Sequence, residues 1–143
     1  MSAITALVNG RIMGDHGLRD GLAVLLQDGR ILAVCPPHDT RLAHAQIHDL
    51  QDRLLLPGFI DVQVNGGGGL LFNDAPTVET LRRIAAAHRR FGTTGLLPTL
   101  ITDTPAVMAN ALDAVDAAIE EGVPGILGIH LEGPFLAGAR KGI

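Results

Sequence analysis

The stretch Gly128–Phe135 (GIHLEGPF) decides how the rest of this sequence is interpreted. It runs through apolar residues to a single carboxylate, Glu132, and then turns at Gly133-Pro134. This pattern is typical of a short buried strand that ends at a loop. A carboxylate deeper in such a strand would carry a large desolvation cost, whereas at the carboxyl end it faces the loops where ligands and metal ions bind. Glu132 is therefore the first candidate functional residue.

Upstream of this stretch, apolar strands alternate with helical patterns. Phe59–Val64 and Leu96–Ile101 are expected to be strands. Apolar residues recur at helical spacing from Val78 to Phe91 and again from Thr104, a suitable N-cap, to Gly122, a suitable stop. With Gly125 to Leu131 as a third strand, the alternation predicts βαβ units and a parallel sheet.

The first 56 residues have a different pattern, in which short apolar runs are separated by turn residues, and this indicates short strands. Asp28-Gly29 lies between two apolar runs and predicts a hairpin, because both central positions of that turn favour positive φ. We expect a small antiparallel β module over residues 1–56 and a second domain over residues 57–143. The strands expected in the module are Ile4–Val8, Gly21–Leu26, Ile31–Val34 and Gln46–Leu50.

Polar side chains alternate along two of the expected strands of the second domain. Asp61, Gln63 and Asn65 share one face of the first strand because the side-chain period of a strand is two, and His130 and Glu132 share one face of the third. The pattern alone leaves alternatives open. The first set fits a structural hydrogen-bond network as well as a site, His130 fits a satisfied core histidine, and Glu132 fits a structural cap.

Composition excludes several functions. The net charge of -4, without a basic patch, argues against nucleic acid as a partner. Cys35 is the only cysteine, which fits a reducing compartment, and we expect a cytoplasmic location. We expect neither a secretory signal nor a membrane span. Ser2 is the only serine, which argues against a Ser-His-Asp hydrolase, and Gly66–Gly69 lacks the register of a nucleotide-binding loop.

Several separated motifs, in one order, resemble the N-acetylglucosamine-6-phosphate deacetylase family of the amidohydrolase superfamily. The resemblance spans Leu56 to Ile143. Its motifs are Leu56–Gly66 (LPGFIDVQVNG), Phe72–Asp74 (FND), Gly92–Thr94 (GTT), Leu97–Thr102 (LPTLIT), His130–Phe135 (HLEGPF) and Lys141-Gly142.

The resemblance implies an α/β fold: about the first three βα units of a (β/α)8 barrel, preceded by part of a small β-sandwich. It implies a metal-dependent hydrolase that removes acetate from N-acetylglucosamine 6-phosphate to give glucosamine 6-phosphate. The implied partner is therefore a small amino-sugar phosphate, and the implied assembly of the full-length protein is a dimer.

The resemblance also assigns site residues. Glu132 matches the metal-binding glutamate, and one divalent ion, zinc or another transition metal, is expected to activate water. Many superfamily members have His-x-His where this chain has Gln63-Val64-Asn65, so these amides are expected to hold water or substrate. Gly142 and Ile143 match a substrate-contacting segment. Asp61 and His130 are expected to support the groups that contact metal and substrate.

Other parts of the family pattern are expected beyond Ile143: two metal-binding histidines, a substrate histidine and the catalytic aspartate. We therefore expect a fragment that is inactive alone. Two alternatives remain, another amidohydrolase of the dihydroorotase or deaminase kind, and a truncated sugar-phosphate-binding module without catalysis.

Overall fold

The computed structural model describes residues 2–137 and residue 139. The predicted contacts of Gly142 and Ile143 lie outside these residues. The chain divides into two compact units, Met1–Pro57 and Gly58–Ile143.

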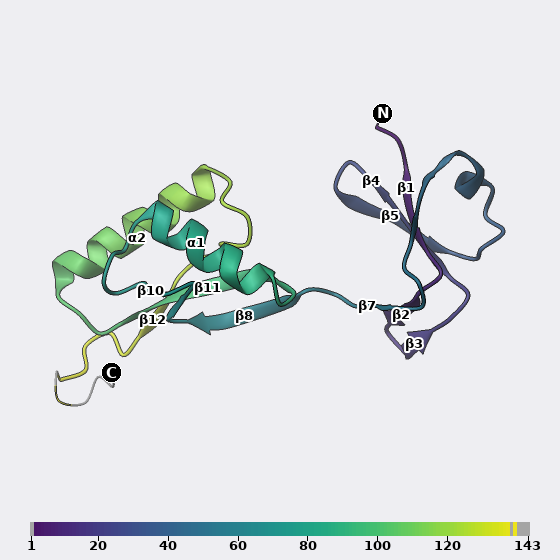
Figure 1. The fold of residues 1–143 in the computed structure, drawn as a ribbon. Helices are drawn as coiled ribbons and strands as arrows, with labels where there is room; N and C mark the ends of the chain where they lie inside the picture. The colour runs from purple at the N-terminus through teal and green to yellow at the C-terminus, as the bar shows by residue number, and fades with distance from the viewer. Residues whose placement is uncertain (1, 138, 140–143) are drawn as a thin grey trace. The chain divides into compact units, whose positions relative to one another are not determined.

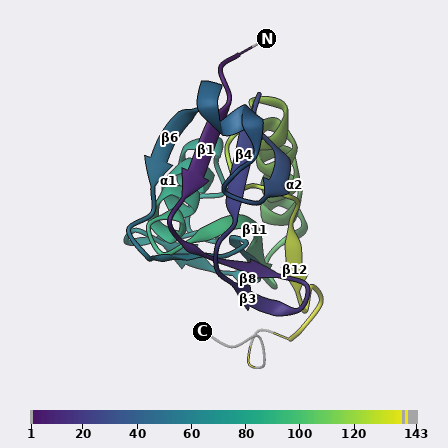
Figure 2. The same cartoon turned by 90° about the vertical axis from the view of Figure 1, so that its right-hand side faces the viewer.

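The first unit is made of short strands and one 3-10 helix (Figures 1 and 2). One sheet has the order β5-β4-β1-β6 and the other the order β3-β2-β7. A small apolar cluster of Ala6, Ala23, Leu25 and Cys35 forms its core. Its elements are β1 (Thr5–Val8), β2 (Arg11–Gly14), β3 (Gly17–Arg19), β4 (Ala23–Gln27), β5 (Arg30–Cys35), η1 (Thr40–His44), β6 (Gln46–Asp49) and β7 (Leu54–Leu55).

Two features of this unit bear on the predictions. The predicted hairpin is confirmed, because β4 and β5 pair antiparallel and Asp28 and Gly29 both have positive φ, 50° and 73°. The expectation of an antiparallel module is wrong in part. β6 runs parallel to β1, and β7 runs parallel to β2. The η1 helix lies between β5 and β6, so the chain crosses over before it pairs again and does not return through a tight hairpin.

The second unit is a three-stranded parallel sheet of order β12-β11-β8, with both helices on one side of it (Figure 1). The predicted mixed α/β class and the parallel βαβ units are confirmed. Its elements are β8 (Phe59–Val64), β9 (Gly66–Gly67), β10 (Leu70–Leu71), α1 (Val78–Arg89), β11 (Thr93–Ile101), α2 (Pro105–Glu120) and β12 (His130–Glu132).

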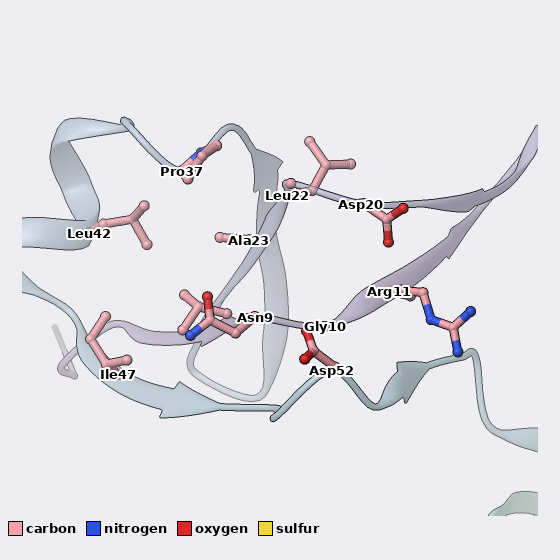
Figure 3. A pocket seen from close by; sticks show the side chains of 12 residues that line it. Asn9, Gly10, Arg11, Asp20, Leu22, Ala23, Pro37, Leu42, Ile47 and Asp52 are labelled. Atoms are coloured by element: carbon pink, nitrogen blue, oxygen red, sulfur yellow. The ribbon is translucent and has the colours of Figure 1, made fainter.

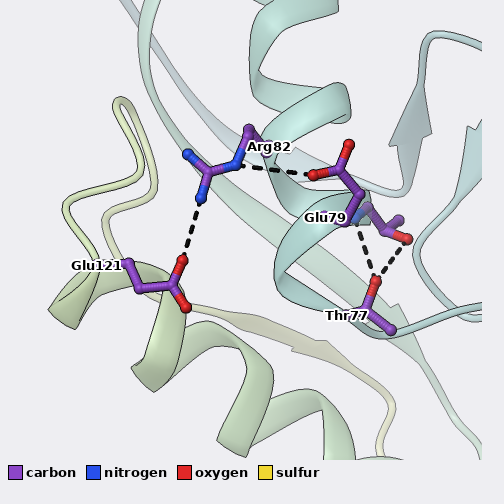
Figure 4. Close-up of polar contacts among 5 residues, drawn as sticks. Thr77, Glu79, Arg82 and Glu121 are labelled. Atoms are coloured by element: carbon purple, nitrogen blue, oxygen red, sulfur yellow. Dashed lines mark hydrogen bonds and ion pairs between the residues drawn. The ribbon is translucent and has the colours of Figure 1, made fainter.

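Local chemistry explains where the two helices begin and end. The Thr77 hydroxyl accepts a hydrogen bond from the Thr80 N–H at 3.2 Å, and Thr104 caps α2 in the same way with Pro105 in the first turn. Gly122, with φ 67°, follows α2 as predicted. Arg82 of α1 forms ion pairs with Glu79 and, at 3.1 Å, with Glu121 at the end of α2 (Figure 4).

The core lies between the sheet and the helices. It contains Phe72, Leu81, Ile84, Leu96 and Leu100, each at most 1 % exposed. Burial on this scale supplies most of the stability of such a unit.

Two details of this unit differ from expectation. Alternation along β8 puts Val62 on the same face as Val64, yet Val64 is buried while Val62 is 63 % exposed, because the buried cluster reaches β8 only at Val64. The strand expected over Gly125–Leu131 is shorter. Gly125 adopts a turn conformation with φ 93°, and Ile126 makes only an isolated bridge to Leu96, so the continuous strand begins at His130.

Candidate functional site

The structure brings the predicted carboxylate and the two predicted amides together. Glu132 Oε2 accepts hydrogen bonds from Gln63 Nε2 at 3.2 Å and from Asn65 Nδ2 at 3.4 Å. The three residues come from β8 and its end and from β12, which lie on opposite sides of β11 in the sheet. Their side chains project from the face opposite the helices, since Val64, which alternates with Gln63 and Asn65, packs in the helix-covered core. Residues 67 and 69 positions apart in sequence therefore share one polar cluster.

The backbone of Glu132 is fixed by the end of β11. Ile101 is its register partner, and the next residue, Thr102, donates to the Glu132 carbonyl twice, from its N–H and from its hydroxyl, both at 3.0 Å. Gly133 has φ 105°, and a Cβ built there would collide with the Thr102 hydroxyl. Because glycine has no Cβ, Gly133 allows Thr102 to approach closely enough to bond the Glu132 carbonyl. These bonds hold the end of β12 rigidly.

Asn65 is held by the hairpin that follows it. Its carbonyl accepts from the N–H of Phe72 at 2.9 Å, and β9 and β10 form a two-stranded hairpin around Gly68 and Gly69, which have φ of 61° and 80°. His88 of α1 fixes the same hairpin, with Nε2 2.9 Å from the Gly66 carbonyl oxygen. A carbonyl only accepts, so His88 Nε2 carries the proton. The glycine run is therefore a tight turn after a strand, and His88 joins it to α1.

Asp61 and His130 lie on the polar face but make other contacts. Asp61 Oδ1 accepts from the backbone N–H of Gln63 at 3.1 Å, so it orders β8 next to the amide. His130 Nδ1 lies 3.1 Å from the hydroxyl of Thr99, its register partner on β11, and Thr99 is fully buried. Among the described residues, the Asp61 contact supports its own strand β8, the His130 contact joins β12 to β11, and neither contact involves the Glu132 carboxylate.

The electrostatic setting of Glu132 suits a metal ligand. Its half-buried carboxylate receives two neutral amide donors, both on Oε2, and no salt bridge among the described residues involves it. A partly buried anion without a cationic partner favours a nearby cation. The described residues contain no group of three or more His, Cys, Asp or Glu side chains placed to hold a metal. Of the three side chains in this cluster, Glu132 alone carries a charge.

Three contributors were missed by sequence reasoning: Asn73, Thr99 and Thr102. Asn73 lies in the Phe72–Asp74 motif, and Thr99 and Thr102 lie in the Leu97–Thr102 motif, so the motifs contained these residues without indicating a role. Asn73 contacts β11 from a turn, and Thr99 and Thr102 contact β12 from β11 and its end, and the side-chain period of a strand does not report such contacts.

The first unit holds none of the predicted site residues. The first unit has a pocket of about 450 Å³ lined by Asn9, Arg11, Asp20, Leu42 and Asp52 among others (Figure 3). His16, His38, His44 and His48 are exposed. No helix in the described part of the chain is long and apolar enough to cross a membrane.

Comparisons with known proteins identify relatives of this chain. No family model matches the chain. It is 47 % identical over 133 residues to an N-acetylgalactosamine-6-phosphate deacetylase of Shewanella, covering 92 % of this chain and 34 % of the relative. It is 35 % identical over 138 residues to an N-acetylglucosamine-6-phosphate deacetylase of Haemophilus influenzae, covering 96 % and 36 %. The chain spans about a third of the length of the curated relatives that it matches.

Solved structures point the same way. The N-acetylglucosamine-6-phosphate deacetylase of Pasteurella multocida matches with a TM-score of 0.90 and 34 % identity, over 98 % of this chain and 37 % of that chain. A variant of the Mycobacterium smegmatis enzyme, in complex with N-acetyl-D-glucosamine-6-phosphate, matches with a TM-score of 0.79 and 29 % identity, over 99 % and 35 %.

This chain is thus similar to one part of the amino-sugar phosphate deacetylases. More particularly, the resemblance to N-acetylglucosamine-6-phosphate deacetylase that the motifs predicted is confirmed, over nearly the whole of this chain.

Proposed function

We propose that this chain is part of an enzyme that removes acetate from N-acetylglucosamine 6-phosphate and yields glucosamine 6-phosphate. One observation carries the proposal: the carboxylate of Glu132 lies within 3.4 Å of the amides of both Gln63 and Asn65, at the carboxyl ends of parallel strands. Functional groups gather at that end of parallel sheets of this kind. The Mycobacterium smegmatis relative was solved with the same acetylated sugar phosphate, which supports this substrate class.

In this proposal Glu132 is one ligand of a single divalent metal ion, zinc or another transition metal. Such an ion polarises an acetamide carbonyl and lowers the pKa of bound water. Both amides donate to Oε2 and neither contacts Oε1, so the amides orient the carboxylate while leaving its other oxygen for the ion. Gln63 and Asn65 each retain a carbonyl oxygen and a further N–H, which suit them to holding water or substrate.

We also propose a wider architecture for the two units. The parallel order β12-β11-β8, with α1 and α2 between successive strands, supports the second unit as the first part of a (β/α)8 barrel. The two small sheets of the first unit support a β-sandwich portion. A dimer and a cytoplasmic location remain predictions that come from the family resemblance and the single cysteine.

A second candidate substrate is N-acetylgalactosamine 6-phosphate, which differs from the first at one hydroxyl-bearing carbon. The observation in its favour is the 47 % identity to the Shewanella deacetylase of that specificity, compared with 35 % to the Haemophilus influenzae enzyme. A site that hydrogen-bonds a particular hydroxyl discriminates strongly against substrates that misplace it.

Acetate release from both sugar phosphates tests the function and separates the two substrates. The assay uses this chain extended to the length of its relatives, with Glu132→Gln and, as a matched control, Glu120→Gln at an exposed position of α2. We expect activity in the parent and the control, and a loss of at least about a hundredfold in Glu132→Gln, because removing a ligand exceeds the 10–100-fold cost of removing its support.

Two results would contradict the proposal. The first is full activity in Glu132→Gln. The second is acetate release by the purified 143-residue chain alone, whose described residues hold no complete metal site.

A further inference from the structure

The middle strand of the second unit, β11, extends beyond the end of its neighbour β8. Its pairing with β8 ends where Pro98 meets Val64, yet β11 continues to Ile101. A residue of a parallel sheet presents its N–H and its carbonyl to the same neighbouring strand. Beyond Val64 those groups of Ile101 therefore need another partner on the β8 side.

The side chain of Asn73 is that partner. Its Oδ1 accepts from the Ile101 N–H at 2.9 Å, and its Nδ2 donates to the Ile101 carbonyl at 3.0 Å. One amide group thus makes the pair of bonds that a neighbouring strand would make. The second hydrogen of Nδ2 is directed to Asp103 Oδ2 at 3.2 Å, and Asp103 Oδ1 accepts from the Thr104 N–H at 2.8 Å.

This bonding pattern requires an amide at position 73. Aspartate at this position would keep the bond from the Ile101 N–H but would set a negative oxygen against the Ile101 carbonyl and the Asp103 carboxylate. An apolar side chain would leave the N–H and the carbonyl of Ile101, which is 4 % exposed, without these partners.

The two hydrogen bonds between the Asn73 side chain and the Ile101 backbone, which we call the Asn73 clamp, hold a residue directly beside Glu132. Ile101 is the register partner of Glu132, and Thr102, the next residue, gives both of its donors to the Glu132 carbonyl. On the other side of Asn73, Phe72 is fully buried and its N–H binds the Asn65 carbonyl at 2.9 Å. The neighbouring residues Phe72 and Asn73 therefore fix both the backbone of Asn65 and the strand end that carries Glu132.

We propose that Asn73 is a positioning residue: by completing the β8 side of β11 at Ile101, it sets the Glu132 carboxylate at hydrogen-bond distance from Asn65 and Gln63. The consequence for catalysis rests on the proposed function. The consequence for structure does not, and the two are measured separately.

The structural arm uses the 143-residue chain, labelled with ¹⁵N. Asn73→Asp is compared with Asn110→Asp, a control at an exposed position of α2. Amide hydrogen exchange is followed at Ile101 and at Leu81, a buried residue of α1, together with the side-chain amide signals of Gln63 and Asn65. In Asn73→Asp we expect exchange at Ile101 to accelerate at least about tenfold, with Leu81 within about twofold and both side-chain signals shifted.

A compensating second substitution tests the hydrogen bond between positions 73 and 103 directly. In Asn73→Asp combined with Asp103→Asn, the amide at position 103 can donate to the carboxylate at position 73. This restores one of the two lost contacts, the one between these two side chains, with donor and acceptor exchanged. We expect part of the protection at Ile101 to return. Asn73→Ser removes the clamp without adding charge and replaces Asn73→Asp if that variant does not fold, with the same expected results.

The catalytic arm uses the chain extended to the length of its relatives. We expect Asn73→Asp to lower kcat at least about tenfold with KM within about twofold, the pattern of an interaction that matters in the transition state, while Asn110→Asp matches the parent. If the parent releases no acetate from either sugar phosphate, the proposed function fails, and the exchange and side-chain signals still decide the positioning role.

Two results would overturn the proposal. One is equal acceleration at Ile101 and Leu81, which would mean that Asn73 only stabilises the whole unit. The other is unchanged signals of Gln63 and Asn65 in a folded variant, which would mean that the clamp does not reach Glu132.

Discussion

Replacing Phe72 by alanine should be among the most damaging single changes to the second unit. Phe72 is fully buried in the cluster that joins β8, α1, β11 and α2, and it lies between the hairpin and the Asn73 clamp. Truncating a buried phenylalanine costs about 3–5 kcal/mol from lost transfer energy and the cavity left behind. The whole stability of a domain is about 5–15 kcal/mol, so the variant loses a large part of it.

Urea unfolding followed by circular dichroism at 222 nm measures this loss. The chain has no Trp or Tyr, so fluorescence is a poor probe, but both α-helices of the described chain lie in the second unit and dominate the dichroism signal. With a urea slope of about 1–3 kcal/mol per molar, the midpoint should fall by at least about 1 M. Phe91→Ala is the matched control because Phe91 is 81 % exposed, and its effect should stay within about 0.5 kcal/mol. Equal midpoints for the two variants would refute the assigned core.

Three further predictions concern other parts of the chain. Hydrogen bonds from Arg41 hold the pKa of Asp39 well below its usual range. The first unit should therefore lose stability as pH falls from about 4, and the variant Asp39→Asn should depend less on pH. The measurement is the urea midpoint of the first unit at several pH values, followed by NMR. Burial raises the pKa of the Cys35 thiol, so alkylation by iodoacetamide at pH 8 should be at least about tenfold slower in the native chain than in urea, and equal rates would contradict its burial. Gly133→Ala should lower the urea midpoint of the second unit more than Gly69→Ala, because both have positive φ but only Gly133 meets the Thr102 hydroxyl.

Local signals in the sequence predicted the local structure well. Asp28-Gly29 specified its hairpin because the turn needs two positive φ angles, and Thr104 with Pro105 specified the start of α2 through capping chemistry. The period of two placed Gln63 and Asn65 on one face, and the structure puts both beside Glu132.

Non-local features could not be predicted in the same way. The distance between Glu132 and Asn65 depends on the register of β8 and β12 against β11, which no local pattern specifies. The parallel pairing of β6 with β1 depends on a crossover through η1. The clamp of Asn73 on Ile101 joins residues 28 positions apart through one side chain, and an asparagine after a strand is equally compatible with an ordinary turn.

Metal content is the most direct test of the central claim, that the Glu132 carboxylate oriented by two neutral amides is a ligand of a divalent ion. The chain extended to the length of its relatives, purified without chelator, is analysed by inductively coupled plasma mass spectrometry beside Glu132→Gln and Glu120→Gln. The account predicts about one metal ion per chain in the parent and in Glu120→Gln, and less than about a tenth of that in Glu132→Gln. Full metal occupancy in Glu132→Gln would contradict it.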